Sequence, residues 1–310
     1  MKKSNLYFYT INYPKYEESI AKMEIEYLFD KSAEDKHLFS DFYIPVSRSA
    51  FIKECISVIY TGPSLEDIVN QIQQNSLGYD NFKVRYVKHE DDTVQYEQRL
   101  KADSIVGFAI IGRAKLHDPD IILGITHVNG QWIFGEYEKN NMDWQRREVK
   151  PYNYSNALGV RTARAIVNLA VVHHTSCKLV DPCCGIGTVV MEAMSMGFDI
   201  KGYEINPLIG ENAKKNLKYF DFQDVITIGD MHVISETYDI AIVDLPYGLF
   251  NPTTLKAQTD IMGTTRRISK RAVIVTMENM NEHIQAAGFK ILDSCHVSKG
   301  KFTRYITICT

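Results

Sequence analysis

A short glycine-containing segment at residues 181–188, Asp-Pro-Cys-Cys-Gly-Ile-Gly-Thr, constrains the fold of this chain more than any other feature. It lies between an apolar run at 178–180 and a second apolar stretch at 189–194, so the predicted order is strand, turn, helix. In doubly wound α/β sheets, this order forms a ligand crevice at the carboxyl end of the first strand. Gly185 and Gly187 can adopt positive φ and let a ligand approach the backbone closely. The following helix would offer free N–H groups to a carboxylate or a polar nucleoside.

The spacing of these glycines argues against the common phosphate-binding loops. The third glycine of a dinucleotide fingerprint would fall at Val190, and the chain contains no G-x-x-x-x-G-K-[ST] loop. A pyrophosphate ligand is therefore not expected. Taken alone, the segment is also compatible with a plain strand-to-helix turn, so the choice depends on residues further along the chain.

Length, charge and cysteine usage limit the function classes. A chain of 310 residues predicts two domains, and its net charge of −3 argues against a non-specific binder of nucleic acid. The six cysteines form no C-x-x-C pair and no metal-ligand spacing, so we expect no bound metal. With no signal peptide and no apolar run of about 18 residues, the sequence predicts a cytoplasmic protein without membrane contact.

The amino-terminal half predicts two small α/β regions followed by a linker. A strand at 6–11 and a helix at 16–29 indicate a subdomain over residues 1–50. Residues 51–140 form the second region, and residues 141–156, with little apolar periodicity, form the linker. The elements expected in the second region are strands at 56–60, 82–87, 120–125 and 132–137 and helices at 64–75 and 92–105.

From residue 157 to residue 310 the pattern changes to a regular alternation of strands and helices. This rhythm predicts a Rossmann-like, doubly wound parallel sheet with helices on both faces and an antiparallel hairpin at the end. The expected strands are 178–181, 199–204, 225–228, 239–243, 272–276 and the hairpin 289–298 with 302–309. The expected helices are 158–172, 188–196, 206–219, 253–268 and 280–287.

Acidic residues follow the second and third strands of this sheet. Glu204 lies 19 positions after Gly185, where nucleotide-binding folds hold a carboxylate that accepts hydrogen bonds from both ribose hydroxyls. Asp230 follows the third strand and would either accept a hydrogen bond from an adenine amino group or simply cap a turn. A solvated acid at a strand end is common, and it is the combination with the glycine turn that favours a nucleoside site.

The fourth strand ends in the motif Asp244-Leu245-Pro246-Tyr247-Gly248. Because the carboxyl ends of parallel strands share one edge of the sheet, this motif should lie beside Asp181. Such a set suits a planar amine: the Asp244 carboxylate and the Leu245 carbonyl can accept hydrogen bonds from an NH₂ group. Pro246 would fix the turn and Tyr247 would stack on the ring.

Taken together, these motifs resemble those of a known family. Residues 181–188 with Glu192 and Ala193 resemble the S-adenosylmethionine loop of the Rossmann-like amino-methyltransferases, and residues 244–247 resemble their (D/N/S)-P-P-(Y/F) motif, with Leu245 in place of the first proline. The helix before that loop in tRNA (guanine-N2)-methyltransferases is similar to residues 161–170 together with Lys150, Pro151, Ser155 and Leu158. Residues 82–85 and 118–137 resemble the RNA-binding THUMP domain. The combination is most similar to the tRNA (guanosine-10-N2)-methyltransferase family.

The resemblance implies a role for each candidate residue. The chain would methylate the N2 amino group of a guanosine in tRNA, using S-adenosyl-L-methionine and no metal, with or without a small activating partner subunit. The implied catalytic residues are Asp244, Leu245, Pro246 and Tyr247. The implied cofactor-binding residues are Asp181, Pro182, Cys183, Gly185, Gly187, Thr188, Glu204, Asp230 and Arg161. The implied RNA-binding residues are Lys83, Arg85, Arg146, Arg147 and Lys150, although an alternating basic strand face is more often just solvated.

Two other functions remain open on the sequence alone. One is methylation of a different exocyclic amine, such as another tRNA or rRNA guanosine, a DNA adenine, or a protein glutamine. The other is non-catalytic RNA binding by a relic methyltransferase fold. The THUMP-like region favours structured RNA, and the intact acid and aromatic residue at 244–247 favour catalysis.

Overall fold

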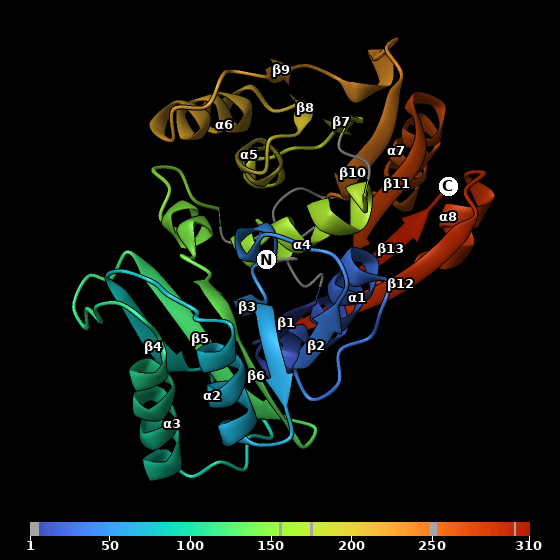
Figure 1. Cartoon of the computed structure of the whole chain (residues 1–310). Coiled ribbons are helices and arrows are strands. Elements are labelled where there is room, and N and C mark those ends of the chain that lie inside the picture. The colour runs from blue at the N-terminus through green and yellow to red at the C-terminus, as the bar shows by residue number, and fades with distance from the viewer. Residues whose placement is uncertain (1–5, 155–156, 174–175, 248–252, 301) are drawn as a thin grey trace. The chain divides into compact units, whose positions relative to one another are not determined.

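The computed structural model describes residues 6–154, 157–173, 176–247, 253–300 and 302–310 (Figure 1). Ser155 and Gly248, which belong to motifs quoted above, lie outside these residues. Contacts group the chain into two units. The first comprises Met1–Asn12 and Ser32–Asn141, and the second comprises Tyr13–Lys31 and Met142–Thr310.

The first unit contains a six-stranded sheet in the order β2-β1-β3-β6-β5-β4. All neighbouring pairs are antiparallel except β4 with β5. The β5–β6 hairpin turns at Asn129 and Gly130, both with positive φ as a tight hairpin turn requires. The strands are β1 (Tyr7–Ile11), β2 (His37–Ser40), β3 (Ile52–Gly62), β4 (Phe82–Tyr86), β5 (Ile121–Val128) and β6 (Gln131–Lys139).

Two helices, α2 (Leu65–Gln74) and α3 (Tyr96–Ala109), contact this sheet through an apolar core. A capping box begins α2, since Ser64 Oγ accepts the Asp67 N–H and the Asp67 carboxylate accepts the Ser64 N–H. α3 begins four residues later than the sequence predicts. The side chain of Asp92 accepts the Val94 N–H, and this local hydrogen bond competes with helix formation.

The sheet of the first unit crosses the boundary expected at residue 50. β1 pairs with β3 along its length, so both predicted amino-terminal regions contribute to one sheet. The sequence predicts a short extended segment at residues 41–45, whereas the edge strand β2 lies just before it, at His37–Ser40.

The second unit contains a seven-stranded sheet in the order β12-β13-β11-β10-β7-β8-β9. Its strands are parallel except β13, which runs antiparallel to both β11 and β12. This is the predicted doubly wound sheet with a terminal hairpin. The strands are β7 (Lys178–Asp181), β8 (Asp199–Glu204), β9 (Ile226–Ile228), β10 (Tyr238–Asp244), β11 (Ser269–Thr276), β12 (Ile291–Lys299) and β13 (Phe302–Cys309).

The helices of the second unit begin within two residues of their predicted starts. Asn206 caps α6 by accepting the N–H groups of Leu208 and Ile209, and Pro207 occupies the first helical position. The helices are α1 (Glu18–Phe29), α4 (Val160–Val171), α5 (Thr188–Ser195), α6 (Pro207–Tyr219), α7 (Leu255–Ile268) and α8 (Asn281–Ala286). Among the described residues, none of the helices combines the length and apolarity needed to cross a membrane.

Helix α1 belongs to the second unit although it precedes most of the first unit in the chain. It contacts α4 and β12, and Asn168 Nδ2 donates a hydrogen bond to the buried Glu24 carboxylate at 2.6 Å (Figure 1). Covered in this way, α4 is buried at every position except Arg161. The expected subdomain over residues 1–50 therefore contributes its strands to one unit and its helix to the other.

Candidate functional site

The strand order of the second sheet reverses between β7 and β10. From β7 the chain continues outwards to β8 and β9, and then returns to β10 and β11 on the opposite side. In open α/β sheets, ligands bind at such a switch point, outside the carboxyl ends of the strands. Asp181 is the last residue of β7 and Asp244 is the last residue of β10. The two acids therefore lie at the same edge, as the sequence predicts.

A cavity of about 630 Å³ opens at this edge of the sheet. The cavity is also lined by residues that the sequence analysis did not single out. Most of these are apolar, and they include Ile205, Met231 and Ile261. Of the predicted cofactor and catalytic residues, those that line it are Asp181, Pro182, Cys183, Gly185, Thr188, Glu204, Asp230, Asp244, Leu245, Pro246 and Tyr247.

The turn after β7 is held by hydrogen bonds from its backbone. Asp181 Oδ1 accepts the Cys183 N–H at 3.2 Å, and Glu204 Oε2 accepts the Gly185 N–H at 3.0 Å. Gly185 has a φ of 55°, and a Cβ added there would meet no atom within 4 Å. Gly187, with a φ of 82°, begins α5 and faces Leu217 and not the cavity. Its role in this structure is to shape the turn.

Glu204 is buried and its two carboxylate oxygens fix two backbone segments. In addition to the Gly185 N–H, it accepts the Asn206 N–H at 2.8 Å. Burial raises the pKa of this carboxyl group, and the backbone hydrogen bonds oppose that rise. Asp181 is also buried, and its pKa is raised well above the ordinary value, first by burial and then by the nearby carboxylates of Asp244 and Glu204. Two of the acids that line the cavity, Asp181 and Glu204, therefore accept hydrogen bonds from the backbone of this turn, and the turn itself contains no cationic side chain.

Asp230 differs from these buried acids because it is exposed. Its Oδ1 accepts the His232 N–H at 2.8 Å and caps a short 3-10 helix, Met231–Val233. It also lines the cavity. Both interpretations of this residue therefore have structural support.

Asp244 lines the cavity and has one carboxylate oxygen that is unsatisfied. Its Oδ1 is buried and has no hydrogen-bond partner among the described residues. Burial raises the pKa of Asp244 to about 7, although the positive charge of Arg304 opposes the rise. Buried polar atoms are nearly always paired, so an unpaired one in a cavity marks a site for a ligand donor.

The turn after Asp244 is fixed by neighbouring elements. The Leu245 N–H donates to the Val275 carbonyl at 3.0 Å, and Gln258 Nε2 donates to the Pro246 carbonyl at 3.0 Å. Leu245 itself is buried, so its side chain packs in the core where the family motif has a proline. The two hydrogen bonds supply rigidity that the missing proline would have given.

Tyr247 is held by a residue that the sequence did not single out. Arg304, on β13, donates a hydrogen bond to Tyr247 Oη at 2.8 Å, and its guanidinium lies 5.8 Å from the ring centroid. The two residues are 57 positions apart, and only the pairing of β13 in the sheet brings them together. No local spacing signals such a contact.

Two basic residues from the predicted sets are engaged elsewhere in the second unit. Arg161 pairs with Glu17 at 2.7 Å and lies over the Trp144 ring, and it does not line the cavity. Arg147 binds the fully buried carboxylate of Glu192 through two nitrogens. The structure gives Arg161 no place in the cofactor cavity, because its charge is used to attach η1 (Lys15–Glu17) to α4.

The other basic candidates are more accessible. Arg85 is exposed on β4, 3.6 Å from Glu54, and lies over the Tyr137 ring, while Lys83 donates to the Leu116 carbonyl. Arg146 is exposed, and Lys150 is half-buried with a pKa lowered by that burial.

Comparisons with known proteins show similarity to methyltransferases. Residues 147–281 match the family model described as the RMKL-like methyltransferase domain. The chain is 32% identical over 157 residues to a tRNA (guanine(10)-N2)-dimethyltransferase of Pyrococcus abyssi, covering 48% of this chain and 46% of that one. It is 24% identical over 219 residues to the protein of the same name from Methanothermobacter thermautotrophicus, covering 68% and 65% of the two chains.

The chain spans about half to two thirds of the length of these relatives. Among solved structures, TrmN from Thermus thermophilus is similar with a TM-score of 0.47 and 13% identity, covering 98% of this chain and 99% of that chain. The chain thus resembles the tRNA (guanine(10)-N2)-dimethyltransferases in sequence, and its residues 147–281 match the RMKL-like methyltransferase domain.

Proposed function

We propose that this protein transfers a methyl group from S-adenosyl-L-methionine to the N2 amino group of a guanosine in tRNA, at position 10. The observation that carries the proposal is that Asp244 lines the same cavity as Asp181 and Glu204 and has a buried carboxylate oxygen, Oδ1, without a hydrogen-bond partner among the described residues. The names of the curated relatives support the choice of nucleoside and of RNA.

The residues of the cavity fit the cofactor. When bound, S-adenosyl-L-methionine supplies a methyl group on a positively charged sulfonium, and the four carboxyl groups that line the cavity provide an environment suited to that charge. Thr188 Oγ1 is buried without a hydrogen-bond partner among the described residues, so it can bind a polar atom of a ligand. We assign Glu204 to the ribose hydroxyls, Asp230 to the adenine amino group, and Ile205 to the adenine ring.

Replacing Glu204 tests this assignment. Because its carboxylate would accept hydrogen bonds from the ribose, Glu204→Ala should weaken cofactor binding by about 1–3 kcal/mol, the cost of leaving polar groups unpaired. Calorimetric titration with S-adenosyl-L-methionine measures the change. The exposed acid Glu236 is the control, and Glu236→Ala should bind as the wild type does. Equal affinity in the Glu204 variant would remove this residue from the site.

Asp244 is placed to act on the amino group of the substrate. The lone pair of the guanine N2 is delocalised into the ring, so the amino group is a weak nucleophile. Hydrogen bonds to Asp244 and the Leu245 carbonyl would orient it and favour the pyramidal nitrogen of the transition state. A carboxylate with a pKa near 7 can also accept the proton that the nitrogen loses. The base must leave its stack to reach the cavity, and Tyr247 offers a stacking surface.

The raised pKa of Asp244 predicts how the rate depends on pH. Since the ionised form is required as acceptor, kcat/KM should rise with pH and level off above about 7. The sign for stability is opposite: burial favours the protonated form, so this group's contribution to folding is lost as the pH rises from 3.8 through 7. Initial rates across this range test the first statement. An Asp244→Asn variant whose rate followed the same curve would assign the titration to another group.

A single exchange of nucleoside tests the substrate. Two tRNA transcripts, one with guanosine and one with inosine at position 10, differ only in the 2-amino group. We expect methylation of the guanosine transcript and none at that position in the inosine transcript, measured by mass spectrometry of digested nucleosides. A DNA duplex with adenines and a glutamine-containing peptide serve as the competing substrates. Methylation of either one in preference to tRNA would contradict the proposal.

The tRNA would be bound in part by the first unit. Lys83 and Arg85 are the candidate contacts there, with Arg146 and Lys150 in the second unit. Because the net charge of the chain is negative, shape and a few local cations must position the RNA. We also propose that the protein acts in the cytoplasm, where tRNA is modified.

A further inference from the structure

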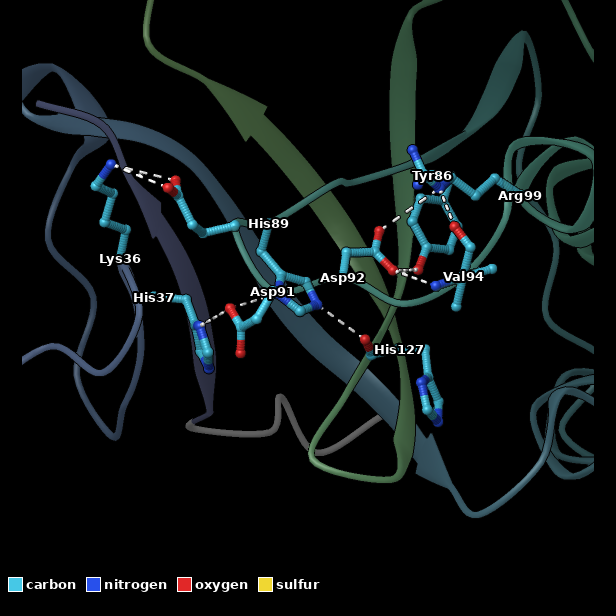
Figure 2. Close-up of polar contacts among 10 residues, drawn as sticks. Lys36, His37, Tyr86, His89, Asp91, Asp92, Val94, Arg99 and His127 are labelled. Atoms are coloured by element: carbon cyan, nitrogen blue, oxygen red, sulfur yellow. Dashed lines mark hydrogen bonds and ion pairs between the residues drawn. The ribbon is translucent and has the colours of Figure 1, made fainter. Parts of the chain in front are cut away.

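Two buried histidines and a half-exposed aspartate lie together in the first unit. His37 begins β2, while His89 and Asp91 lie between β4 and α3 (Figure 2). One possible ligand atom from each lies within 4.8 Å of the others, a grouping of three that occurs once in the part of the chain the structure describes. This cluster is distinct from the residues assigned to methyl transfer.

The separations between Asp91 and the two histidines are close to those of atoms that share a metal ion. Asp91 Oδ1 lies 3.4 Å from His89 Nδ1 and 3.7 Å from His37 Nδ1. Nitrogen-to-oxygen hydrogen bonds are commonly near 2.9–3.0 Å, so both contacts are long for that purpose. In a tetrahedral zinc site with bonds of about 2.0–2.2 Å, neighbouring ligand atoms are about 3.4 Å apart.

The hydrogen bond at the far side of His89 directs its other nitrogen into the cluster. His89 Nε2 lies 2.9 Å from the His127 carbonyl oxygen, which can only accept, so Nε2 carries the proton. When the ring is neutral, Nδ1 presents its lone pair to an Asp91 oxygen, and these two atoms repel unless a proton or a metal ion lies between them. Histidines that bind metals are held in this way, with one ring N–H donated to a backbone carbonyl.

His37 provides the second unsatisfied nitrogen. Its ring is 3% exposed, and Nδ1 has no hydrogen-bond partner among the residues described. A buried nitrogen without a partner loses its hydration and gains nothing in return. A metal ion at the centre of the cluster would satisfy this atom and His89 Nδ1 together.

The surroundings hold the three ligands in place before any ion binds. Phe8 packs against both imidazoles, with ring centroids 5.7 and 6.1 Å away. Asp92, next to the ligand Asp91, is fully buried and accepts hydrogen bonds from Tyr86 Oη and the Val94 N–H (Figure 2). The segment carrying two of the three ligands is therefore fixed by its neighbours.

We propose that His37, His89 and Asp91 bind one divalent transition-metal ion, with zinc as the best fit to two imidazoles and one carboxylate. Asp91 is 47% exposed, so water can complete the coordination from the solvent side. The ion would join the edge strand β2 to the segment after β4, which the Lys36–Glu90 ion pair already links at 3.2 Å. The sequence offers no motif for this site because 52 positions separate its two histidines.

Metal binding by the full-length protein tests the proposal. After treatment with a chelator and desalting, the protein should take up one equivalent of zinc, measured by elemental analysis and calorimetric titration. Asp91→Asn should weaken binding on the order of 100-fold, because losing a ligand costs at least as much as losing an outer partner. His117→Asn, an exposed histidine of the same unit, is the matched control and should bind as the wild type does.

Cobalt substitution distinguishes this cluster from the cysteines. Cobalt bound by nitrogen and oxygen should show only weak visible bands, without the strong near-ultraviolet band of a cobalt–thiolate bond. Absence of saturable zinc binding, or a thiolate band, would overturn the proposal. So would unchanged affinity in Asp91→Asn, a surface variant that should keep its fold and is checked by circular dichroism. The His37→Asn variant should also bind zinc more weakly than the wild type, as the Asp91→Asn variant does.

Discussion

Asp244→Ala is expected to lower kcat for tRNA methylation by about 10²–10³-fold, the usual cost of removing one preorganised electrostatic contact. The residue ends a buried strand, and the hydrogen bonds of Leu245 and Pro246 hold the turn that follows it. Its unpaired oxygen would bind the substrate amino group more strongly in the transition state than in the ground state. Cofactor and tRNA affinities should therefore change little while kcat falls. Single-turnover methylation with purified tRNA measures the effect.

Two further variants separate the roles of this carboxylate. Asp244→Asn keeps one acceptor oxygen but cannot take a proton, so it should retain more activity than the alanine variant if orientation dominates. Asp239→Asn, at the opposite end of the same strand, is the control and should keep wild-type kcat. A wild-type rate from Asp244→Ala would refute the mechanism and direct attention to other substrates.

Glu192→Gln is expected to reduce the free energy of unfolding by about 3–5 kcal/mol, the cost of leaving buried charge uncompensated. The carboxylate is fully buried and pairs with both Arg147 and Arg164. Glutamine has nearly the same shape but no charge, so two guanidinium groups would lose their anion. Denaturant unfolding monitored by circular dichroism measures the loss.

An exposed ion pair supplies the comparison. Glu236 pairs with Lys201 at 2.7 Å, and both side chains are about half exposed. Removing the charge in Glu236→Gln should leave the unfolding midpoint almost unchanged, because solvent screens such pairs. Equal stability of the Glu192 and Glu236 variants would show that the buried network does not support the fold.

The carboxyl-terminal sheet and the cavity residues could be predicted from sequence because their signals are local. A buried strand followed by Asp181 or Asp244 must deliver its acid to one sheet edge, and the glycine turn fixes where that edge opens. Together with the family resemblance, these signals predicted eleven residues that line the cavity. The site itself depends on a topology that the alternation of strands and helices already implies.

The features that could not be predicted depend on contacts distant in sequence. Arg304 contacts Tyr247 through the pairing of β13, and Arg161 and Arg147 are engaged by Glu17 and Glu192. A basic residue in a sequence carries no sign of whether a buried acid will pair with it. The same limit displaced the predicted position of β2 and hid the unit to which α1 belongs, since the sequence of a short edge strand or an amphipathic helix does not indicate its partners.

The placement of α1 has a consequence for the nascent chain. This helix leaves the ribosome about 130 residues before α4, the helix that buries it, so at 5–20 residues per second it waits roughly 7–26 s for its partner. During that interval its apolar face, which includes Ile25 and Phe29, is uncovered and available to chaperones. Translation speed across the intervening first unit would thus influence the yield of folded protein, and removing the first 31 residues would deprive the second unit of part of its own interior.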